Sequence, residues 1–149
     1  MSIFIREARS EDADAVSSLI IAAIKETNAK DYPASFIKKL PDNFSAENVA
    51  GRMLSRKVYV AVKSGDIIGT ASLDKATVRS VFVMPNHQEV GIGLALMKHI
   101  EALAMQSYVK TLTVPSSITA EGFYQKLGYV KVREEYEGEE KIILMSKSL

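Results

Sequence analysis

Cysteine is absent from this chain of 149 residues. Its absence excludes a disulfide-stapled scaffold, a thiolate zinc site and a cysteine nucleophile, and it agrees with a reducing compartment. An excess of charge of one sign is also missing, because 19 Lys and Arg residues stand against 18 Asp and Glu residues, for a formal net charge of +1. Such a balance provides no broad basic surface for nucleic acid or for an anionic membrane, so we expect neither as a partner.

Long apolar runs are lacking as well. The longest one near the N-terminus, residues 19–24, is far shorter than the roughly 20 residues that a helix needs to cross a bilayer. Residues 1–7 lack the basic segment followed by an apolar stretch that marks a secretory signal. These features predict a cytoplasmic protein without a membrane-spanning segment.

Hydrophobic residues are plentiful nonetheless. They make up 47% of the sequence, which is enough for a substantial core at a mass of 16.4 kDa. No repeat, low-complexity stretch or linker interrupts the chain. We therefore expect residues 1–149 to form a single domain.

The first third of the chain predicts one strand followed by helices. Alternating apolar residues indicate a strand at residues 3–8, and Ser10 begins a helix that should run to about Thr27. A short helix is expected over residues 32–41, where Pro41 should end it. Another helix should occupy residues 45–55.

The remainder of the chain predicts a sheet. Apolar and β-branched segments indicate strands at residues 57–63, 67–73, 76–84, 111–114, 129–134 and 141–145. A helix is expected at residues 118–127, and a longer one has an apolar stripe formed by Leu94, Met97, Ile100, Leu103 and Ala104. The pattern is that of an α/β protein, α+β in type, with a mixed but mostly antiparallel sheet of about seven strands flanked by helices.

The most informative segment is a loop with two glycines, Gly91 and Gly93, between a strand and a helix. At the start of a helix several backbone N–H groups lack intrahelical partners, and glycine lets an anion approach them closely. Such a loop is typical of a phosphate-binding site. A dinucleotide fingerprint would need a third glycine where Leu96 stands, and a P-loop would need Gly-Lys-Ser/Thr, which occurs nowhere. Both alternatives fit poorly.

Two spaced motifs resemble those of the GNAT superfamily of N-acetyltransferases. The first is Gln88-x-x-Gly91-x-Gly93, preceded by Val81-x-Val83-x-Pro85, and it is similar to the acyl-CoA signature of that family. The second is Ser117-x-x-Ala120-x-x-Phe123-Tyr124-x-x-Leu127-Gly128-Tyr129. The resemblance extends to the order of elements over nearly the whole chain, and it implies the GNAT-like acyl-CoA N-acyltransferase fold.

The resemblance implies acetyl-CoA as the co-substrate. In the family, the strand that corresponds to residues 81–83 diverges from its neighbour, its backbone pairs with the pantetheine amides, and the following loop holds the pyrophosphate. The residues implied to contact the cofactor are Val81, Phe82, Val83, Gln88, Glu89, Val90, Gly91, Ile92, Gly93, Leu94 and Ser117. We expect no metal, because the two histidines have no third ligand at a suitable spacing.

Tyr124 matches a tyrosine that the family often places near the thioester sulfur. A phenol there can protonate or hydrogen-bond the departing thiolate, so the resemblance implies that Tyr124 is the catalytic acid. Two positions depart from the family pattern, since Ser117 stands where Asn is common and Gln88 where Arg is common. We expect each change to weaken one polar contact and to leave the backbone site intact. No motif fixes the general base, and the candidates are Glu26, Asp31, Asp74 and a chain of waters.

Two further segments, residues 28–32 and the acidic run 134–140, fall where the family builds its acceptor pocket. The acidic run suits a cationic amine, although a solvated turn has the same composition. The resemblance implies an acetyl-CoA-dependent N-acetyltransferase in which a primary amine of a small molecule attacks the thioester directly in a ternary complex. A protein N-acetyltransferase and a non-catalytic CoA-binding or regulatory domain are the alternatives. The resemblance also implies that a homodimer would not be unusual.

Overall fold

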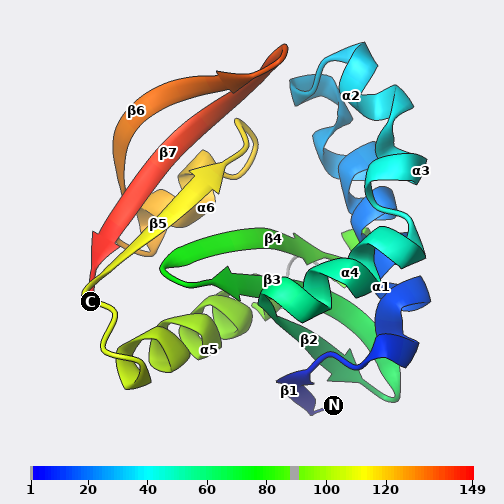
Figure 1. Cartoon of the computed structure of the whole chain (residues 1–149), viewed down its shortest axis with the longest axis horizontal. Coiled ribbons are helices and arrows are strands. Elements are labelled where there is room, and N and C mark those ends of the chain that lie inside the picture. The colour runs from blue at the N-terminus through cyan, green and yellow to red at the C-terminus, as the bar shows by residue number, and fades with distance from the viewer. Residues whose placement is uncertain (1, 88–90) are drawn as a thin grey trace.

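The computed structural model of the chain describes residues 2–87 and 91–149. Its centre is a seven-stranded sheet with the strand order β1-β2-β3-β4-β5-β7-β6 (Figure 1). The strands are β1 (Ile3–Glu7), β2 (Lys57–Lys63), β3 (Asp66–Asp74), β4 (Thr77–Val83), β5 (Thr111–Ser116), β6 (Val130–Glu137) and β7 (Glu140–Ser148). The α-helices are α1 (Ala13–Ala23), α2 (Ala34–Lys38), α3 (Leu40–Asn43), α4 (Ala46–Ser55), α5 (Ile92–Gln106) and α6 (Glu121–Lys126).

The sheet consists of two arms. Strands β1 to β4 form the first arm and are antiparallel to one another, and β5, β7 and β6 form the second arm, also antiparallel. The arms meet where β4 and β5 run parallel, and they diverge from that point (Figure 1). The mixed, mostly antiparallel sheet flanked by helices confirms the fold that the sequence predicts.

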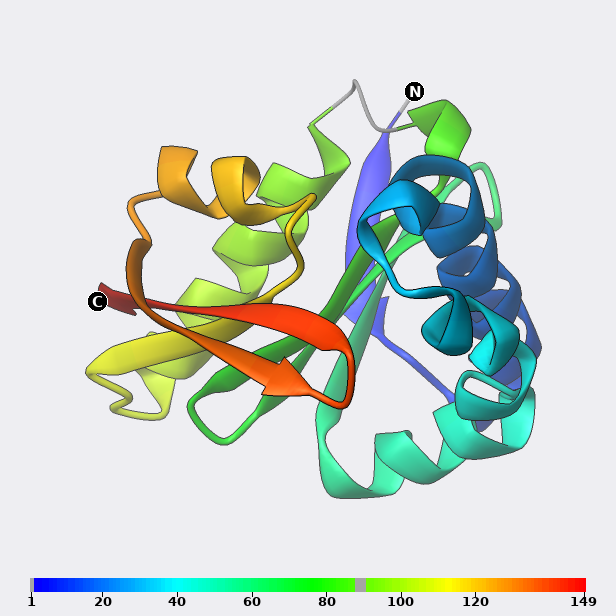
Figure 2. The ribbon, with the colours of Figure 1, turned by 90° about the horizontal axis from the view of Figure 1, so that it is seen from above.

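Helices cover both faces of the first arm (Figure 2). Helices α1 and α4 lie on one face, where Val16 and Val49 are buried against Val60 of β2. Helix α5 lies on the other face, where Leu96 and Ile100 are fully buried. Burying these apolar side chains on both faces is the main force that holds the first arm together.

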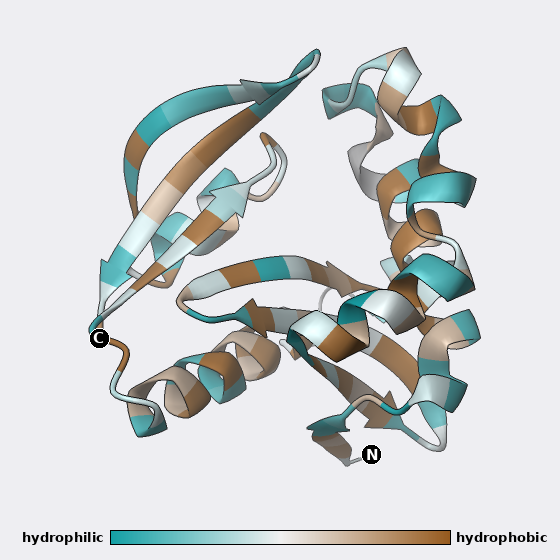
Figure 3. Cartoon of the chain, in the orientation of Figure 1, coloured by the Kyte–Doolittle hydropathy of each residue, from teal (hydrophilic) through white to brown (hydrophobic). Residues whose placement is uncertain are grey.

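The second arm is covered mainly on one face. In Figure 3 the strand β7 carries a continuous hydrophobic stretch, whereas the edge strand β6 is mainly hydrophilic. A polar hub joins this arm to α5, because the hydroxyl of Tyr129 donates to Oε2 of Glu101 at 2.8 Å and Nζ of Lys147 lies 3.1 Å from the same carboxylate. No helix in the described part of the chain is long and apolar enough to cross a membrane.

Local sequence explains where several elements begin. The turn between β2 and β3 places Ser64 at φ 52° and Gly65 at φ 84°, and two successive positive φ angles match the twist of a tight hairpin. Helix α4 begins after Ser45, whose Oγ accepts a hydrogen bond from the backbone N–H of Asn48 at 3.2 Å. This cap satisfies one of the donors that every helix leaves unpaired at its start.

The helical region before β2 differs from the prediction. The α-helix expected to reach Thr27 ends at Ala23, and the chain continues in a π-helical segment (Ile24–Asn28) and a 3-10 turn (Ala29–Asp31). Pro41 does not end a helix but lies in the first turn of α3, where its missing N–H costs no hydrogen bond. Proline is compatible with both positions, so composition alone does not distinguish them.

Two further differences concern the elements that border the site. Leu94, expected in the apolar stripe of the long helix, is 39% exposed, whereas Leu96, which was not assigned to that stripe, is fully buried. The helix expected at residues 118–127 is shorter, because residues 118–120 form a turn that precedes α6. Both changes leave side chains or backbone facing the gap between the two arms.

Candidate functional site

Strand β4 is irregular at the point where the two arms part. Thr70 pairs with Phe82 and Ser72 pairs with Arg79, so Ser80 and Val81 together oppose the single residue between them on β3. Ser80 has a φ of 53°, a left-handed backbone conformation that residues other than glycine rarely adopt. Such a β-bulge bends a strand and redirects its side chains, and bulges are frequent next to active sites.

The junction of the two arms is narrow. Within the described residues, β4 and β5 pair at one position, Thr77 with Thr113, where the two side-chain oxygens lie 3.2 Å apart. The N–H of Thr113 also donates to the carbonyl of Ala76 at 3.0 Å. Beyond this single pair the two strands diverge, so the edge of β4 that carries Val81 and Val83 faces a gap instead of a neighbouring strand.

The first turn of α5 borders the same gap. Gly91 is the N-cap residue, with φ 74°, and no side chain in the described part of the chain caps this end of the helix. The 15-residue helix therefore begins with backbone N–H groups that point outward at the positive end of its dipole. This is the arrangement that binds phosphate oxygens.

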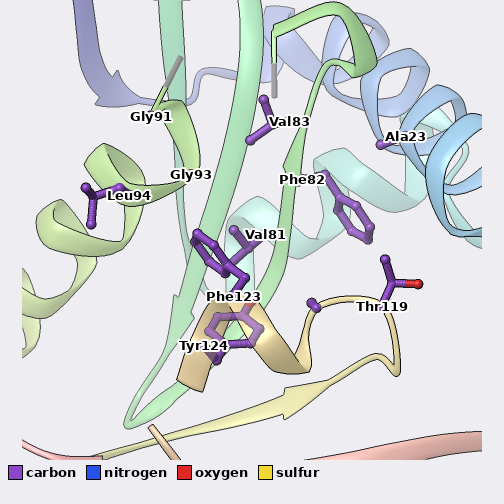
Figure 4. Close-up of a pocket in the computed structure, with 11 residues that line it drawn as sticks. Ala23, Val81, Phe82, Val83, Gly91, Gly93, Leu94, Thr119, Phe123 and Tyr124 are labelled. Atoms are coloured by element: carbon purple, nitrogen blue, oxygen red, sulfur yellow. The ribbon is translucent and has the colours of Figure 1, made fainter. Parts of the chain in front are cut away.

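A cavity of about 270 Å³ fills the gap (Figure 4). Its wall combines residues of α1, β4, the start of α5 and the turn into α6: Ala23, Val81, Phe82, Val83, Gly91, Gly93, Leu94, Thr119, Ala120, Phe123 and Tyr124. We call this the acyl cavity. A Cβ placed on Gly93 would lie 3.2 Å from two atoms of the Phe123 ring, so a side chain at this position would narrow the cavity.

Tyr124 is almost fully buried in the wall of the acyl cavity, with 5% of its surface exposed. Its ring makes edge-on contacts with Phe123 at 5.1 Å and with Tyr129 at 5.7 Å between centroids. Burial raises the pKa of the Tyr124 hydroxyl well above 10, and the nearby Tyr32 adds to the effect. The phenol therefore remains protonated at neutral pH and is available as a hydrogen-bond donor.

The structure brings most of the predicted site residues together, but not all of them. Ile92 is fully buried, and its side chain packs in the core beside Gly69 instead of facing the cavity. Ser117 does not line the cavity, and its Oγ accepts a hydrogen bond from the N–H of Ala120 at 3.2 Å. The predicted contacts at Gln88, Glu89 and Val90 lie outside the described residues.

Some cavity residues were not predicted as contacts. Ala120 and Phe123 belong to the second motif, so that motif already contained the signal for them. Ala23 and Thr119 carry no such signal, because their positions depend on how α1 and the turn before α6 pack. Thr119 is held by a hydrogen bond from its Oγ1 to Oδ2 of Asp31, which joins the second arm to the helical layer.

None of the predicted candidates for the general base lines the acyl cavity. Glu26 is exposed on the π-helical segment, Asp31 accepts from Thr119, and Asp74 pairs with Arg79 at 3.5 Å at the far end of β3. Among the described residues, no group of three or more His, Asp and Glu side chains is arranged to hold a metal ion.

A second cavity, of about 250 Å³, adjoins the first, and Phe82 lines both. We call it the polar cavity. Its lining mixes aromatic and charged side chains from segments spread along the chain, namely Ile24, Tyr32, Phe36, Phe44, Arg52, Arg56, Arg79, Ser80, Phe82, Pro115, Glu137, Glu140 and Ile142. Glu137 and Glu140 belong to the predicted acidic run, and Tyr32 to the other segment that the resemblance implied for the acceptor.

Solved structures of other proteins share this fold. A GCN5-related N-acetyltransferase from Rhodopseudomonas palustris is 26% identical, with a TM-score of 0.92 over 100% of this chain and 97% of that one. The PaiA N-acetyltransferase of Thermoplasma acidophilum, solved in complex with coenzyme A, is 19% identical, with a TM-score of 0.87 and full coverage of both chains (100%). YjaB of Escherichia coli, solved in its apo form, is 20% identical, with a TM-score of 0.78 over 98% of this chain and 96% of that one.

The sequence itself leads to the same family. Among curated proteins, none matches the chain. The acetyltransferase (GNAT) domain family, however, matches residues 24–147 of this chain. The matched range is most of the chain and includes both motifs. This match, together with the divergent β4 and β5 strands and the open start of α5, shows that the chain belongs to the GNAT acetyltransferase family.

Proposed function

We propose that this protein is an acetyl-CoA-dependent N-acetyltransferase that acetylates a primary amine of a small molecule by direct attack in a ternary complex. The observation that carries the proposal is the acyl cavity, which joins an open strand edge, an uncapped helix start and a buried phenol in one wall. Each of these features fits a different part of acetyl-CoA.

The helix start fits the pyrophosphate. The first-turn N–H groups of α5, including those of Gly93 and Leu94, supply donors at the positive end of the dipole. Glycine at position 93 leaves space in the cavity beside the helix start, since even a Cβ there would contact Phe123. The loop residues Gln88, Glu89 and Val90 belong to the proposed pyrophosphate site on the strength of the motif.

The edge of β4 fits the pantetheine arm. The N–H of Met84 donates to the carbonyl of Ile68 at 2.8 Å, and successive N–H groups of an extended strand alternate in direction. Alternate main-chain groups of β4 therefore face the side from which β5 has diverged, along the stretch from residue 81 to residue 83. By the family resemblance, this strand edge is suited to pair with the pantetheine amides and to polarise the thioester carbonyl.

Tyr124 is proposed to act on the leaving sulfur. When bound, acetyl-CoA supplies an activated thioester whose sulfur leaves with the electron pair of the C–S bond as the amine forms the C–N bond. Burial holds the pKa of Tyr124 well above that of a thiol, which is about 8.5, so complete proton transfer from the phenol is unfavourable. Tyr124 is therefore better suited to stabilise the developing thiolate by a hydrogen bond than to act as a full acid.

The size of the polar cavity favours a small acceptor. Its volume of about 250 Å³ matches a compact amine better than an extended peptide. Because Phe82 lines both cavities, we expect an amine held in the polar cavity to lie near a thioester held in the acyl cavity. Holding both reactants in adjacent cavities would provide the proximity that direct transfer requires.

Calorimetric titration with acetyl-CoA and with desulfo-CoA tests the cofactor site. We expect micromolar binding of both ligands, since neither the phosphate nor the pantetheine contacts require the sulfur. No binding to a folded sample would contradict the proposal. A subsequent assay of thiol release should show turnover with small amines, whereas tight binding without turnover on small amines or peptides would favour the regulatory alternative.

A further inference from the structure

The polar cavity gathers three arginines from two elements of the first arm. Arg52 lies in the last turn of α4, Arg56 directly follows this helix, and Arg79 comes from β4. Burial lowers the pKa of Arg56, and the charges of Arg52 and Arg79 lower it further. The three guanidinium groups therefore repel one another across a partly dehydrated space.

The arginines are only partly compensated. Arg52 donates through Nη2 to the carbonyl of Asn43 at 2.7 Å and lies over the Phe44 ring at 4.9 Å, but its buried Nη1 has no hydrogen-bond partner among residues 2–87 and 91–149. Within the same ranges the Arg56 side chain makes no ion pair or hydrogen bond. Arg79 pairs with Asp74 through one contact of 3.5 Å.

The carboxylates of the cavity come from the other arm. Glu137 and Glu140 flank the turn of the β6–β7 hairpin, whose tip lies beside α2 (Figures 1 and 2). Neither forms an ion pair with an arginine within the described part of the chain. Charges of opposite sign are thus kept apart on the two sides of one small cavity, although a direct ion pair would have neutralised both.

We propose that the acceptor is a small amine that also carries an anionic oxygen group, a carboxylate or a phosphoryl group, which Arg52, Arg56 and Arg79 bind. The inference rests on the proposed function and specifies its substrate class. The buried Nη1 of Arg52 lacks an acceptor within the described ranges and the other two guanidinium groups are partly buried, so a bidentate oxyanion would supply the missing acceptors. Glu137 and Glu140 on the opposite side suit the ammonium end of the same molecule.

The charge arrangement also discriminates against other amines. A polycation would be repelled by three arginines in a space of about 250 Å³. An amine without an anionic group would leave the Nη1 of Arg52 and the guanidinium of Arg56 unpaired while excluding water from them. The acidic run alone suits a cationic amine, and the arginines add the requirement for an anionic group on the same molecule.

The decisive experiment compares matched acceptors. Thiol release from acetyl-CoA is measured with a mixture of the common L-amino acids, with a mixture of the corresponding amino amides, with phosphoethanolamine, with ethanolamine and with spermidine. We expect turnover with an amine that carries an anionic group to exceed turnover with the counterpart that lacks this group at least about tenfold in kcat/KM. Preference for amino acids assigns the anion as a carboxylate, and preference for phosphoethanolamine assigns it as a phosphoryl group.

Variants and direct binding connect the preference to the cavity. In Arg56→Gln, or in Arg79→Gln if the first variant does not fold, kcat/KM for the acceptor with an anionic group should fall to the value for the counterpart that lacks this group. Titration of that acceptor into CoA-saturated protein should show the same loss of affinity. Arg133→Gln is the matched control, because Arg133 is 59% exposed on β6 and pairs with Glu135, away from the cavity.

The outcomes separate the two proposals. If CoA binds but spermidine or the amines that lack an anionic group react as well as those that carry one, the substrate class is overturned and the cofactor site stands. The same conclusion follows if no amine with an anionic group reacts. Equal losses in Arg56→Gln and Arg133→Gln would also overturn it. If the folded protein does not bind CoA, the proposed function itself fails.

Discussion

The acyl cavity and the polar cavity share Phe82 but are built in different ways. The acyl cavity is mostly backbone, glycine and apolar side chains, and most of its wall comes from two short motifs, each continuous in the sequence. The polar cavity is lined by charged and aromatic side chains from segments scattered between Ile24 and Ile142. In the proposed assignment, the cofactor common to the family is bound by backbone geometry, whereas the acceptor of this member is selected by side chains.

The largest effect is expected from a substitution that fills the acyl cavity. In Gly93→Val the new side chain must displace Phe123, whose ring would lie 3.2 Å from the Cβ alone, so we expect the Kd for CoA to rise about 100-fold. Titration calorimetry measures the change. Gly122→Ala on α6 is the matched control, since a Cβ there meets nothing within 4 Å, and its affinity should stay within roughly twofold.

Tyr124→Phe should separate chemistry from binding within the same cavity. Removing the hydroxyl deprives the leaving sulfur of its donor, and we expect kcat to fall at least about tenfold while the Kd for CoA is unchanged. Steady-state kinetics and calorimetry test this prediction. Tyr129→Phe is the control, because that hydroxyl binds Glu101 outside the cavity. It should lower the free energy of unfolding by about 1 kcal/mol and leave kcat unchanged. Unaltered turnover in Tyr124→Phe would reject the role of the phenol.

Ser45→Ala tests whether α4, which carries Arg52 and is followed directly by Arg56, is coupled to the acyl cavity. Loss of the cap on the N–H of Asn48 should reduce the free energy of unfolding by about 1 kcal/mol, as measured by denaturant titration. The affinity for CoA should not change, because α4 does not contribute to the acyl cavity. A weaker affinity for CoA would show that the two cavities are coupled.

The smallest expected effect concerns Glu140. Burial, together with the charge of Glu137, raises the pKa of Glu140 to about 7 from its usual value of 4.5. The folded protein thus holds this proton more strongly than the unfolded chain, so the contribution of Glu140 to stability is complete below about pH 4.5 and is lost as the pH rises through 7. Because the side chain is partly exposed, Glu140→Gln should raise Tm by only roughly 1–3 °C at pH 8.

The Tm difference between Glu140→Gln and the wild type should disappear near pH 4.5, where both side chains are uncharged in the folded protein. Differential scanning calorimetry over this range measures it. A Tm difference that is the same at every pH would contradict the raised pKa of Glu140. The guanidinium groups of Arg52, Arg56 and Arg79 face the same cavity, so the measurement is made at constant ionic strength.

Periodicity predicted the elements well where tertiary contacts agree with local preference. The predicted strand at residues 57–63 coincides with β2, and Ser45 caps α4 as expected. The predicted strand at residues 141–145 is only the apolar middle of β7, which continues to Ser148 because it pairs with β5 along its length. Backbone pairing lengthens a strand without any signal in its side chains.

The site shows the same division. Glycines, the β4 valines and Tyr124 lie in motifs whose spacing already places them on one strand, one helix start and one short helix, so the sequence predicts the acyl cavity. Two residues that the motifs assigned to the cofactor do not line the acyl cavity with their side chains. The side chain of Ile92 is directed into the core by the rotation of the helix. The hydroxyl of Ser117 caps the following turn.

The sequence by itself determined the family, the order of the elements and the cofactor motifs, because each depends on contacts between residues that are close along the chain. The tertiary structure alone decided the polar cavity. Arg56 and Glu140 come within one cavity only because β4 and β5 separate after a single pair and the β6–β7 hairpin returns toward α2. The sequence does not indicate that charged residues so far apart along the chain line the same cavity. A net charge of +1 likewise does not show that arginines from one arm and glutamates from the other line it together.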